Sequence, residues 1–285
     1  MSVIQVGLVD KTGQLDATLV QTVAQALNIQ VARDLPQFWN VQATVIYLPD
    51  PRRIPAGVWP AMLVDNLPPG EGGVHLDKNN QPYAKVVASP DSDGWTIAAS
   101  HEVVEMLVDP SGNRLQTSRS IEIVDGNKIE DGPSEFQYLV EACDPCESDA
   151  YGYLIQGVAV SDFLTPHFYD PVVTSGTRYS FTGALTGPRQ ILPGGYISWI
   201  DPTADQWQQL RWIDPNQNPE IVDLGPAAQS RSLREWIDGI TSKTDLQTTI
   251  RIARDPINKD LLANGKERRT KLEEIAQFRA DQHFR

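Results

Sequence analysis

The chain has 285 residues, of which 40% are hydrophobic and 21% charged, so it has the length and composition of a globular protein with a full core and room for more than one domain. Its formal net charge of −13 argues against a nucleic-acid partner, because phosphate contacts need a basic face. The sequence contains no apolar run long enough for a membrane span, and the N-terminus lacks the basic start and apolar core of a signal peptide. We therefore expect a cytoplasmic protein or a component of a particle.

The pattern from the N-terminus to residue 88 predicts a small sheet with one helix. Apolar density or alternation predicts strands at residues 3–9, 41–47, 59–64, 74–76 and 83–88, and helical spacing predicts a helix over 19–27. We expect residues 83–88, the last strand before the next helix, to form the sheet edge beside a cleft. An extended peptide can pair with such an edge.

A mostly apolar helix predicted over residues 95–108 carries three ionisable side chains, His101, Glu102 and Glu105. Residues four apart stack on one side of a helix, so His101 and Glu105 face the same way and Glu102 lies about 100° around. Zincin metallopeptidases use this geometry as His-Glu-x-x-His, where the outer residues hold zinc and the inner Glu is the base. With Glu105 in place of the second His, calcium or manganese is also conceivable. The alternative is a polar stripe in which a backbone carbonyl satisfies His101.

A second group of possible ligands follows in the segment Glu141-Ala-Cys-Asp-Pro-Cys-Glu147. It contains both cysteines of the chain, Cys143 and Cys146, whose spacing is compatible with metal binding, redox chemistry or a small strained disulfide. The acids and thiols together make this segment a candidate partner for the His-Glu helix.

These two segments, taken in order, resemble the plant EXORDIUM (phosphate-induced) proteins and related bacterial sequences. The resemblance covers about residues 95–165 and rests on Ser100-His-Glu-Val-Val-Glu105 with Asp109-Pro110, on Glu141-x-x-Asp144-x-Cys146-Glu147, and on Tyr151-Gly followed by a strand ending Val158-x-Val160. That family has a zincin-like His-Glu-x-x-Glu helix and a downstream Glu-x-x-Asp-x-Cys segment. The plant proteins are exported, whereas this chain shows no secretion signal, and Cys143 is an addition to the pattern.

The motif and the resemblance together imply a zinc site that hydrolyses peptide bonds. We expect His101 and Glu105 to be ligands and either Asp144 or Glu141 to be the third, which leaves a fourth position for water. Glu102 is then the catalytic base that takes a proton from the metal-bound water. Another divalent cation in place of zinc is possible, and the expected partner is a peptide or protein substrate.

Other side chains near these segments have a structural and a functional interpretation. Asp109 is either a further ligand or a helix-terminal residue bonded to local backbone. Tyr151 or Tyr153 could stabilise an oxyanion, although a packed aromatic is the simpler expectation. His75 and His167 are available imidazoles, which we place on a strand edge or in a loop.

The C-terminal third changes character. Residues 177–185, 195–200 and 206–212 are aromatic and β-leaning, and helical patterns follow at 232–240, 246–253 and 258–285. We expect an α+β fold with a zincin-like mixed sheet and a long buried active-site helix in residues 1–175, a β-rich extension in 176–225 and a helical tail in 226–285. Because such a tail suits self-association or assembly, the rival hypothesis is a structural or adaptor protein, for example of a phage particle, with a structural or degenerate metal site.

Overall fold

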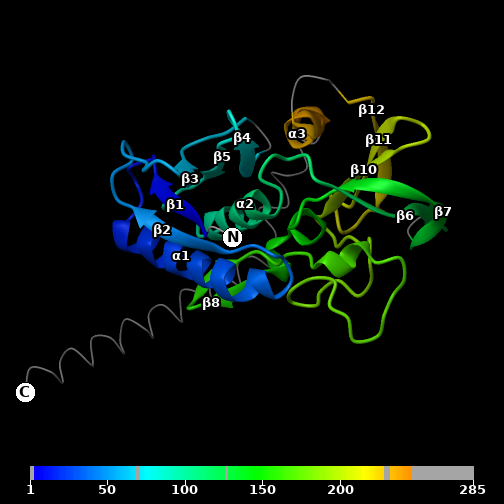
Figure 1. Cartoon of the computed structure of the whole chain (residues 1–285), viewed down its shortest axis with the longest axis horizontal. Coiled ribbons are helices and arrows are strands. Elements are labelled where there is room, and N and C mark those ends of the chain that lie inside the picture. Colours follow the sequence, from blue (N-terminus) through cyan, green and yellow to red (C-terminus); the bar gives the residue numbers. More distant parts are fainter. Residues whose placement is uncertain (1–2, 69–70, 126–127, 228–231, 245–285) are drawn as a thin grey trace, which may run out of the picture.

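The computed structural model describes residues 3–68, 71–125, 128–227 and 232–244. These residues form a mixed α+β structure with two five-stranded sheets and a two-stranded sheet, so the expected α+β class is confirmed at that level. The two larger sheets lie beside each other and give the molecule an elongated outline (Figure 1). None of the described helices combines the length and apolar character needed to cross a bilayer.

The first sheet has the order β2-β1-β3-β5-β4. Its strands are β1 (Ile4–Asp10), β2 (Ala43–Leu48), β3 (Val58–Val64), β4 (Gly73–Asp77) and β5 (Pro82–Val87). All neighbours pair in parallel except β4 and β5, which are antiparallel. The expectation that residues 83–88 form the edge of the sheet is wrong. A tight turn between Lys78 and Gln81 joins β4 to β5 as a hairpin, in which β4 lies on the outer side of β5. Strand β4 is therefore the edge.

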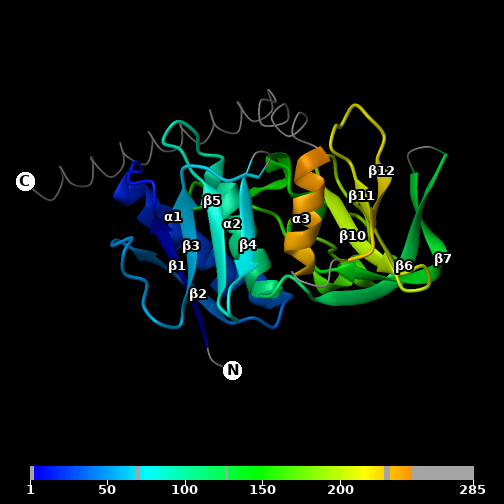
Figure 2. The same cartoon turned by 90° about the horizontal axis from the view of Figure 1, so that it is seen from above.

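Helices α1 (Ala17–Ile29) and α2 (Trp95–Val108) lie on the same side of the first sheet (Figure 2). The Asp16 carboxylate accepts a hydrogen bond from the Leu19 amide and caps the start of α1. A π-helical turn (Gln30–Asp34) and a 3-10 turn (Leu35–Gln37) continue α1. Helix α2 ends at Val108, before Asp109 and Pro110, since a residue that precedes proline disfavours helical backbone. Nearly every side chain of α2 is buried, including its three ionisable ones.

The second sheet is wholly antiparallel, with the order β12-β11-β10-β7-β6. Its strands are β6 (Leu115–Val124), β7 (Lys128–Leu139), β10 (Tyr196–Asp201), β11 (Gln206–Arg211) and β12 (Glu220–Gly225). The pairing of β7 with β10 joins segments on both sides of the boundary expected at residue 175. Residues 177–185 form no strand in the described structure and contribute only an isolated bridge between Leu164 and Ser180.

Short elements lie in the chain between β7 and β10 of the second sheet. They are the strands β8 (Tyr153–Ile155) and β9 (Val158–Val160) and the 3-10 turns η3 (Asp144–Cys146), η4 (Asp149–Tyr151) and η5 (Pro166–Tyr169). Helix α3 (Leu233–Thr244) lies between the edge strand β4 and the strands β10 to β12 (Figure 2). The helices expected at 246–253 and 258–285 fall outside the described residues.

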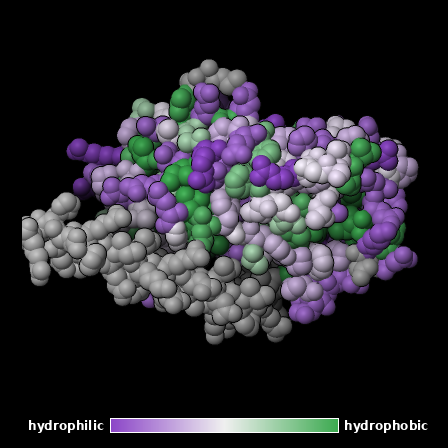
Figure 3. All heavy atoms as spheres, turned by 90° about the horizontal axis from the view of Figure 1, so that it is seen from below, coloured by the Kyte–Doolittle hydropathy of each residue, from purple (hydrophilic) through white to green (hydrophobic). Residues whose placement is uncertain are grey.

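The core reaches across both sheets. One continuous apolar cluster runs from Val6 in β1 to Leu210 in β11, and a smaller cluster around Trp207 and Ile237 docks α3 onto the second sheet. On the face seen from below, apolar side chains occur in separate patches among polar ones (Figure 3). The shared cluster fixes the position of α2 relative to the second sheet, and this brings the site residues together.

Candidate metal centre

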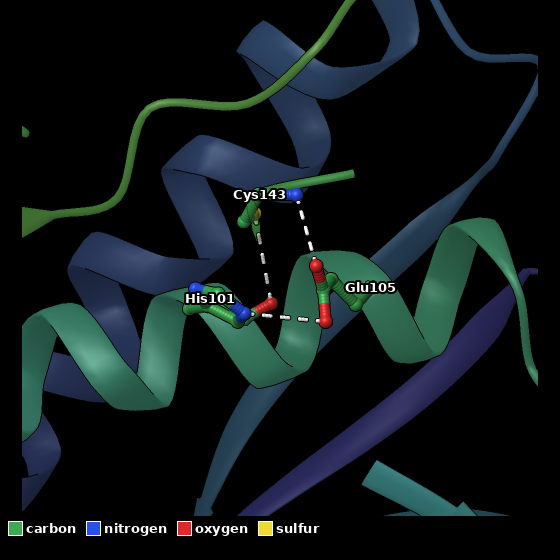
Figure 4. Close-up of side chains that lie close together, drawn as sticks. All are labelled: His101, Glu105 and Cys143. Carbon is green, nitrogen blue, oxygen red and sulfur yellow. Dashed lines mark hydrogen bonds and ion pairs between the residues drawn. The ribbon is translucent and has the colours of Figure 1, made fainter. Parts of the chain in front are cut away.

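Helix α2 supplies two side chains from neighbouring turns. The His101 Nε2 atom lies 3.2 Å from the Glu105 Oε2 atom, and both side chains are buried. Figure 4 shows the imidazole and the carboxylate along one side of α2, with Cys143 facing them. The spacing of four residues thus places both groups on one face, as the helical period requires.

The turn η3 brings Asp144 to the same place. Its Oδ1 atom lies 3.1 Å from His101 Nε2. Donor atoms bound at about 2.0–2.1 Å to one tetrahedral zinc ion stand about 3.3 Å apart. Glu105 Oε2 and Asp144 Oδ1 lie 3.2 and 3.1 Å from His101 Nε2, and each of these two separations is close to that value.

Backbone contacts hold both carboxylates in position. The Cys143 amide donates to Glu105 Oε1 at 2.9 Å, which turns Oε2 towards the imidazole. A Cβ atom at Gly195 would lie 2.6 Å from the Pro145 carbonyl oxygen, so only glycine lets the start of β10 lie against η3. Among the described residues, neither Glu105 Oε2 nor Asp144 Oδ1 has a hydrogen-bond partner. These two buried oxygens therefore meet their neighbours through ion-pair contacts such as those with His101.

The edge strand β4 adds His75, which the sequence predicted on a strand edge or in a loop, outside the site. His75 does lie on the edge strand, but its imidazole is only 1% exposed and points inward. Its Nδ1 atom lies 3.4 Å from Glu102 Oε2 and 3.5 Å from Glu105 Oε2, and its Nε2 atom lies 3.9 Å from Glu141 Oε2. The alternation of side chains along β4 could have indicated that His75 points inward, but it could not have indicated the carboxylates that lie near the ring.

Helix α3 adds Arg234, which no sequence pattern indicated. Its Nη1 atom lies 2.5 Å from Asp144 Oδ2, 3.1 Å from Glu141 Oε2 and 3.7 Å from Glu105 Oε2. Its Nε atom pairs with Asp238 at 3.0 Å. The guanidinium group is therefore a buried positive charge inside the acidic cluster.

All four predicted ligands lie in this cluster, but their surroundings differ. His101 has Glu105 on one side, together with Cys143, and Asp144 on another, together with Glu147, whereas Glu141 faces Arg234 and His75. Between Asp144 and Glu141 as third ligand, the distances favour Asp144. Glu147, which was not among the predicted ligands, also offers an atom close to His101 and Asp144.

Burial and opposite charges shift the pKa values in this cluster. Burial opposes charge on Glu105, but the neighbouring His101 and Arg234 outweigh burial and hold its pKa well below the usual range. Burial also opposes charge on His101, yet Glu105 and Asp144 raise its pKa well above the ordinary value. Burial raises the pKa of Glu147 to about 8. A cation bound here would take the place of the imidazolium proton.

The cysteines contribute little to this charge. Cys143 and Cys146 are both free and buried, so they form no disulfide. Burial raises the pKa of both thiols well above the ordinary value. The Cys143 thiol faces the His101 carbonyl oxygen at 3.8 Å. The protonated thiols carry no charge, and Cys143 offers its sulfur atom close to both His101 and Glu105.

A cleft of about 290 Å³ opens beside the cluster, between β4 and α3. Its walls include residues 71–74, His101 and Glu102 from α2, and Arg234, Asp238 and Thr241 from α3. The volume is at the lower end of the range for ligand pockets. The imidazole and the predicted base thus reach a space that a small substrate segment could enter.

Several residues considered from the sequence lie elsewhere. The Asp109 carboxylate accepts from the Arg114 amide at 2.7 Å, which is the local interpretation. The Tyr153 hydroxyl donates to Asp34 at 2.9 Å, and His167 pairs with Asp170 at 2.8 Å. None of the four candidates from the sequence, Asp109, Tyr151, Tyr153 and His167, lines the cleft.

Comparison with known proteins adds no relative to this geometry. No protein-family model, no curated protein and no solved structure matches the chain.

Proposed function

We propose that this chain is a zinc-dependent hydrolase that cleaves peptide bonds at the cluster around His101. The observation that carries the proposal is the approach of two buried carboxylate oxygens, Glu105 Oε2 at 3.2 Å and Asp144 Oδ1 at 3.1 Å, to His101 Nε2. One nitrogen and two oxygens leave a fourth tetrahedral position. Zinc bound there would supply an acidic water and polarise a carbonyl group.

The neighbouring residues suit a hydrolytic role. Glu102 follows His101 on α2 and lines the cleft, where it can accept a proton. The outer side of β4 has no strand partner in the described structure, so an extended peptide can pair with it next to the cleft. The zincin-like interpretation and the EXORDIUM resemblance remain part of this proposal.

The test compares zinc-loaded full-length protein with a Glu102→Gln variant on a mixed peptide library, with cleavage read by mass spectrometry. The native protein should cleave peptides, and Glu102→Gln should lower the rate by about 10²- to 10⁴-fold while zinc at His101 is retained. Glu135→Gln, an exposed glutamate on β7, is the matched control and should match the native rate. Equal cleavage by native protein and Glu102→Gln would contradict the assigned base.

The burial of the cluster favours one alternative, a structural cation site in an assembly protein. Glu105 and Asp144 are 0% exposed, and Arg234 approaches them from α3. A structural site has protein donors in every coordination position. Cobalt-substituted protein distinguishes the two proposals, because azide should change the visible spectrum of an open site and leave that of a closed site unchanged.

A further inference from the structure

We propose that His75, Glu102 and Glu105 hold a second divalent cation beside the one at His101, with the Glu105 carboxylate bridging the two. This inference rests on the proposed function, because it places the second cation next to the first. It concerns His75, a buried imidazole that the single-metal site leaves without a role.

The His75 side chain is buried without a hydrogen-bond partner in the part of the chain that the structure describes. It is 1% exposed, and neither ring nitrogen has a hydrogen-bond partner among the described residues. A buried polar group without a hydrogen-bond partner destabilises the fold. Both nitrogens nevertheless face carboxylates, Nδ1 towards Glu102 and Glu105 and Nε2 towards Glu141. A cation at Nδ1 would satisfy the imidazole and two of these acids together.

The distances around His75 Nδ1 also suit a bound cation. His75 Nδ1 lies 3.4 Å from Glu102 Oε2 and 3.5 Å from Glu105 Oε2, close to the separation of about 3.3 Å between donors on one tetrahedral zinc ion. Glu102 Oε2 and Glu105 Oε2 also lack hydrogen-bond partners in the described chain. These three donors form a set with the same chemistry as the set at His101, one imidazole nitrogen and two carboxylate oxygens.

The set at His75 and the set at His101 share one atom, Glu105 Oε2. Glu105 Oε2 lies 3.2 Å from His101 Nε2 and 3.5 Å from His75 Nδ1. A carboxylate between two imidazoles is the arrangement of dinuclear hydrolytic sites, in which the two metals stand about 3.5–4 Å apart. Arg234 Nη1 lies 3.7 Å from this shared oxygen, farther than either imidazole nitrogen, and its closest contact is to Asp144 Oδ2.

The surroundings of the second set also fit a metal ligand. Glu141 Oε2 faces the far nitrogen of His75 at 3.9 Å, so a small movement would let Nε2–H donate to it, as metal-bound histidines commonly do. An added Cβ at Gly73 would lie 2.6 Å from Glu102 Oε1. Glycine therefore keeps room for Glu102, whose Oε2 can bind the cation while Oε1 accepts the proton in the proposed reaction.

The test is the zinc stoichiometry of the full chain, stripped with chelator, reloaded with zinc and analysed by elemental mass spectrometry after dialysis. We expect two zinc ions per native chain and one in His75→Ala, whose second ion should bind at least about 10- to 100-fold more weakly. His167→Ala is the matched control, since His167 is exposed and pairs only with Asp170 among the described residues, and it should keep two.

The outcomes separate this inference from the proposed function. One zinc ion per native chain, lost in His101→Ala, overturns the second site and leaves the first intact. No zinc in the native chain overturns both, and two zinc ions retained in His75→Ala overturn the assignment of His75. If His75→Ala fails to fold, native protein loaded with cobalt decides, because paired cobalt ions bridged by Glu105 should show magnetic coupling that isolated ions lack.

Discussion

The two large sheets contribute differently to the site. The first sheet and α2 supply His75, His101, Glu102 and Glu105, which come from one helix and the strand beside it. The second sheet and its docked helix α3 supply Arg234, a positive charge in direct contact with Glu141 and Asp144. The comparison teaches that both imidazoles and two carboxylates come from adjacent elements of one layer, whereas Asp144 and the compensating charge of Arg234 come from other parts of the chain.

Removing the positive charge of Arg234 should have the largest effect on the free energy of unfolding. In Arg234→Ala, the buried Glu141 and Asp144 carboxylates lose their closest cation, and breaking a buried pair in this way costs about 3–5 kcal/mol. Urea unfolding of metal-free protein measures this loss. Added zinc should restore part of it, because a cation again faces the acids.

Arg52→Ala is the control for this prediction, since its side chain is 88% exposed and pairs with Asp50 at the surface. Its free energy of unfolding should differ from that of the native protein by less than about 0.5 kcal/mol. Equal stability of Arg234→Ala and Arg52→Ala would show that Arg234 does not compensate the cluster.

Loosening α3 without touching its charge should have the next largest effect. Ile237 is 1% exposed in the small cluster that docks α3, so Ile237→Ala should cost about 3 kcal/mol. Leu27→Ala in α1, which is 0% exposed, should cost a similar amount in the first sheet's core. Hydrogen exchange should show α3 opening in Ile237→Ala alone. Opening in both variants would mean that the two regions unfold as one.

The first sheet's contribution is tested by His101→Ala. Loss of this ligand should weaken zinc binding by at least about 100-fold, more than the loss of an outer contact, and this corresponds to about 2.7 kcal/mol. Competition with a chromophoric chelator measures the affinity. His167→Ala should bind zinc as the native chain does, and an unchanged affinity in His101→Ala would remove this residue from the site.

The smallest effect concerns Tyr138 in the second sheet. Burial raises the pKa of its phenol, while in the unfolded chain it titrates near the ordinary value of about 10. The neutral phenol therefore stabilises the fold below about pH 10, and this contribution falls as the pH rises further, by up to about 1.4 kcal/mol per unit. Urea titrations at pH 9 and 11 should show a smaller decrease for Tyr138→Phe. An equal decrease in both proteins would contradict the assignment.

The sequence predicted the first sheet and α2 well, because their signals are local. Apolar periodicity placed β1, β2, β3, β5 and α2 within a few residues of their observed bounds, and the four-residue spacing placed His101 and Glu105 on one face. The proximity of Asp144 followed only from its acidic neighbours and the family resemblance. Local pattern and motif order were sufficient for these elements.

The rest depends on pairings between distant segments. The polar residues 111–135 predict a loop or a weak hairpin through 121–124 with a partner near Ile129. The structure pairs Ile123 with Ile129, but in a much longer ribbon, β6–β7, because each strand satisfies the other's backbone and β10 pairs with β7. Arg234 reaches the site only because Ile237 and its neighbours dock α3. His75 was missed because register, rather than composition, turns its ring inward.

The hydrogen bond from the Cys143 amide to Glu105 limits which amino acids can occupy position 143. The donor is a peptide nitrogen, so nearly every amino acid at 143 can supply it, and proline alone among the common residues cannot. The constraint on 143 is thus one of volume and backbone shape, and the thiol itself is replaceable by another small side chain without loss of the anchor that orients Glu105.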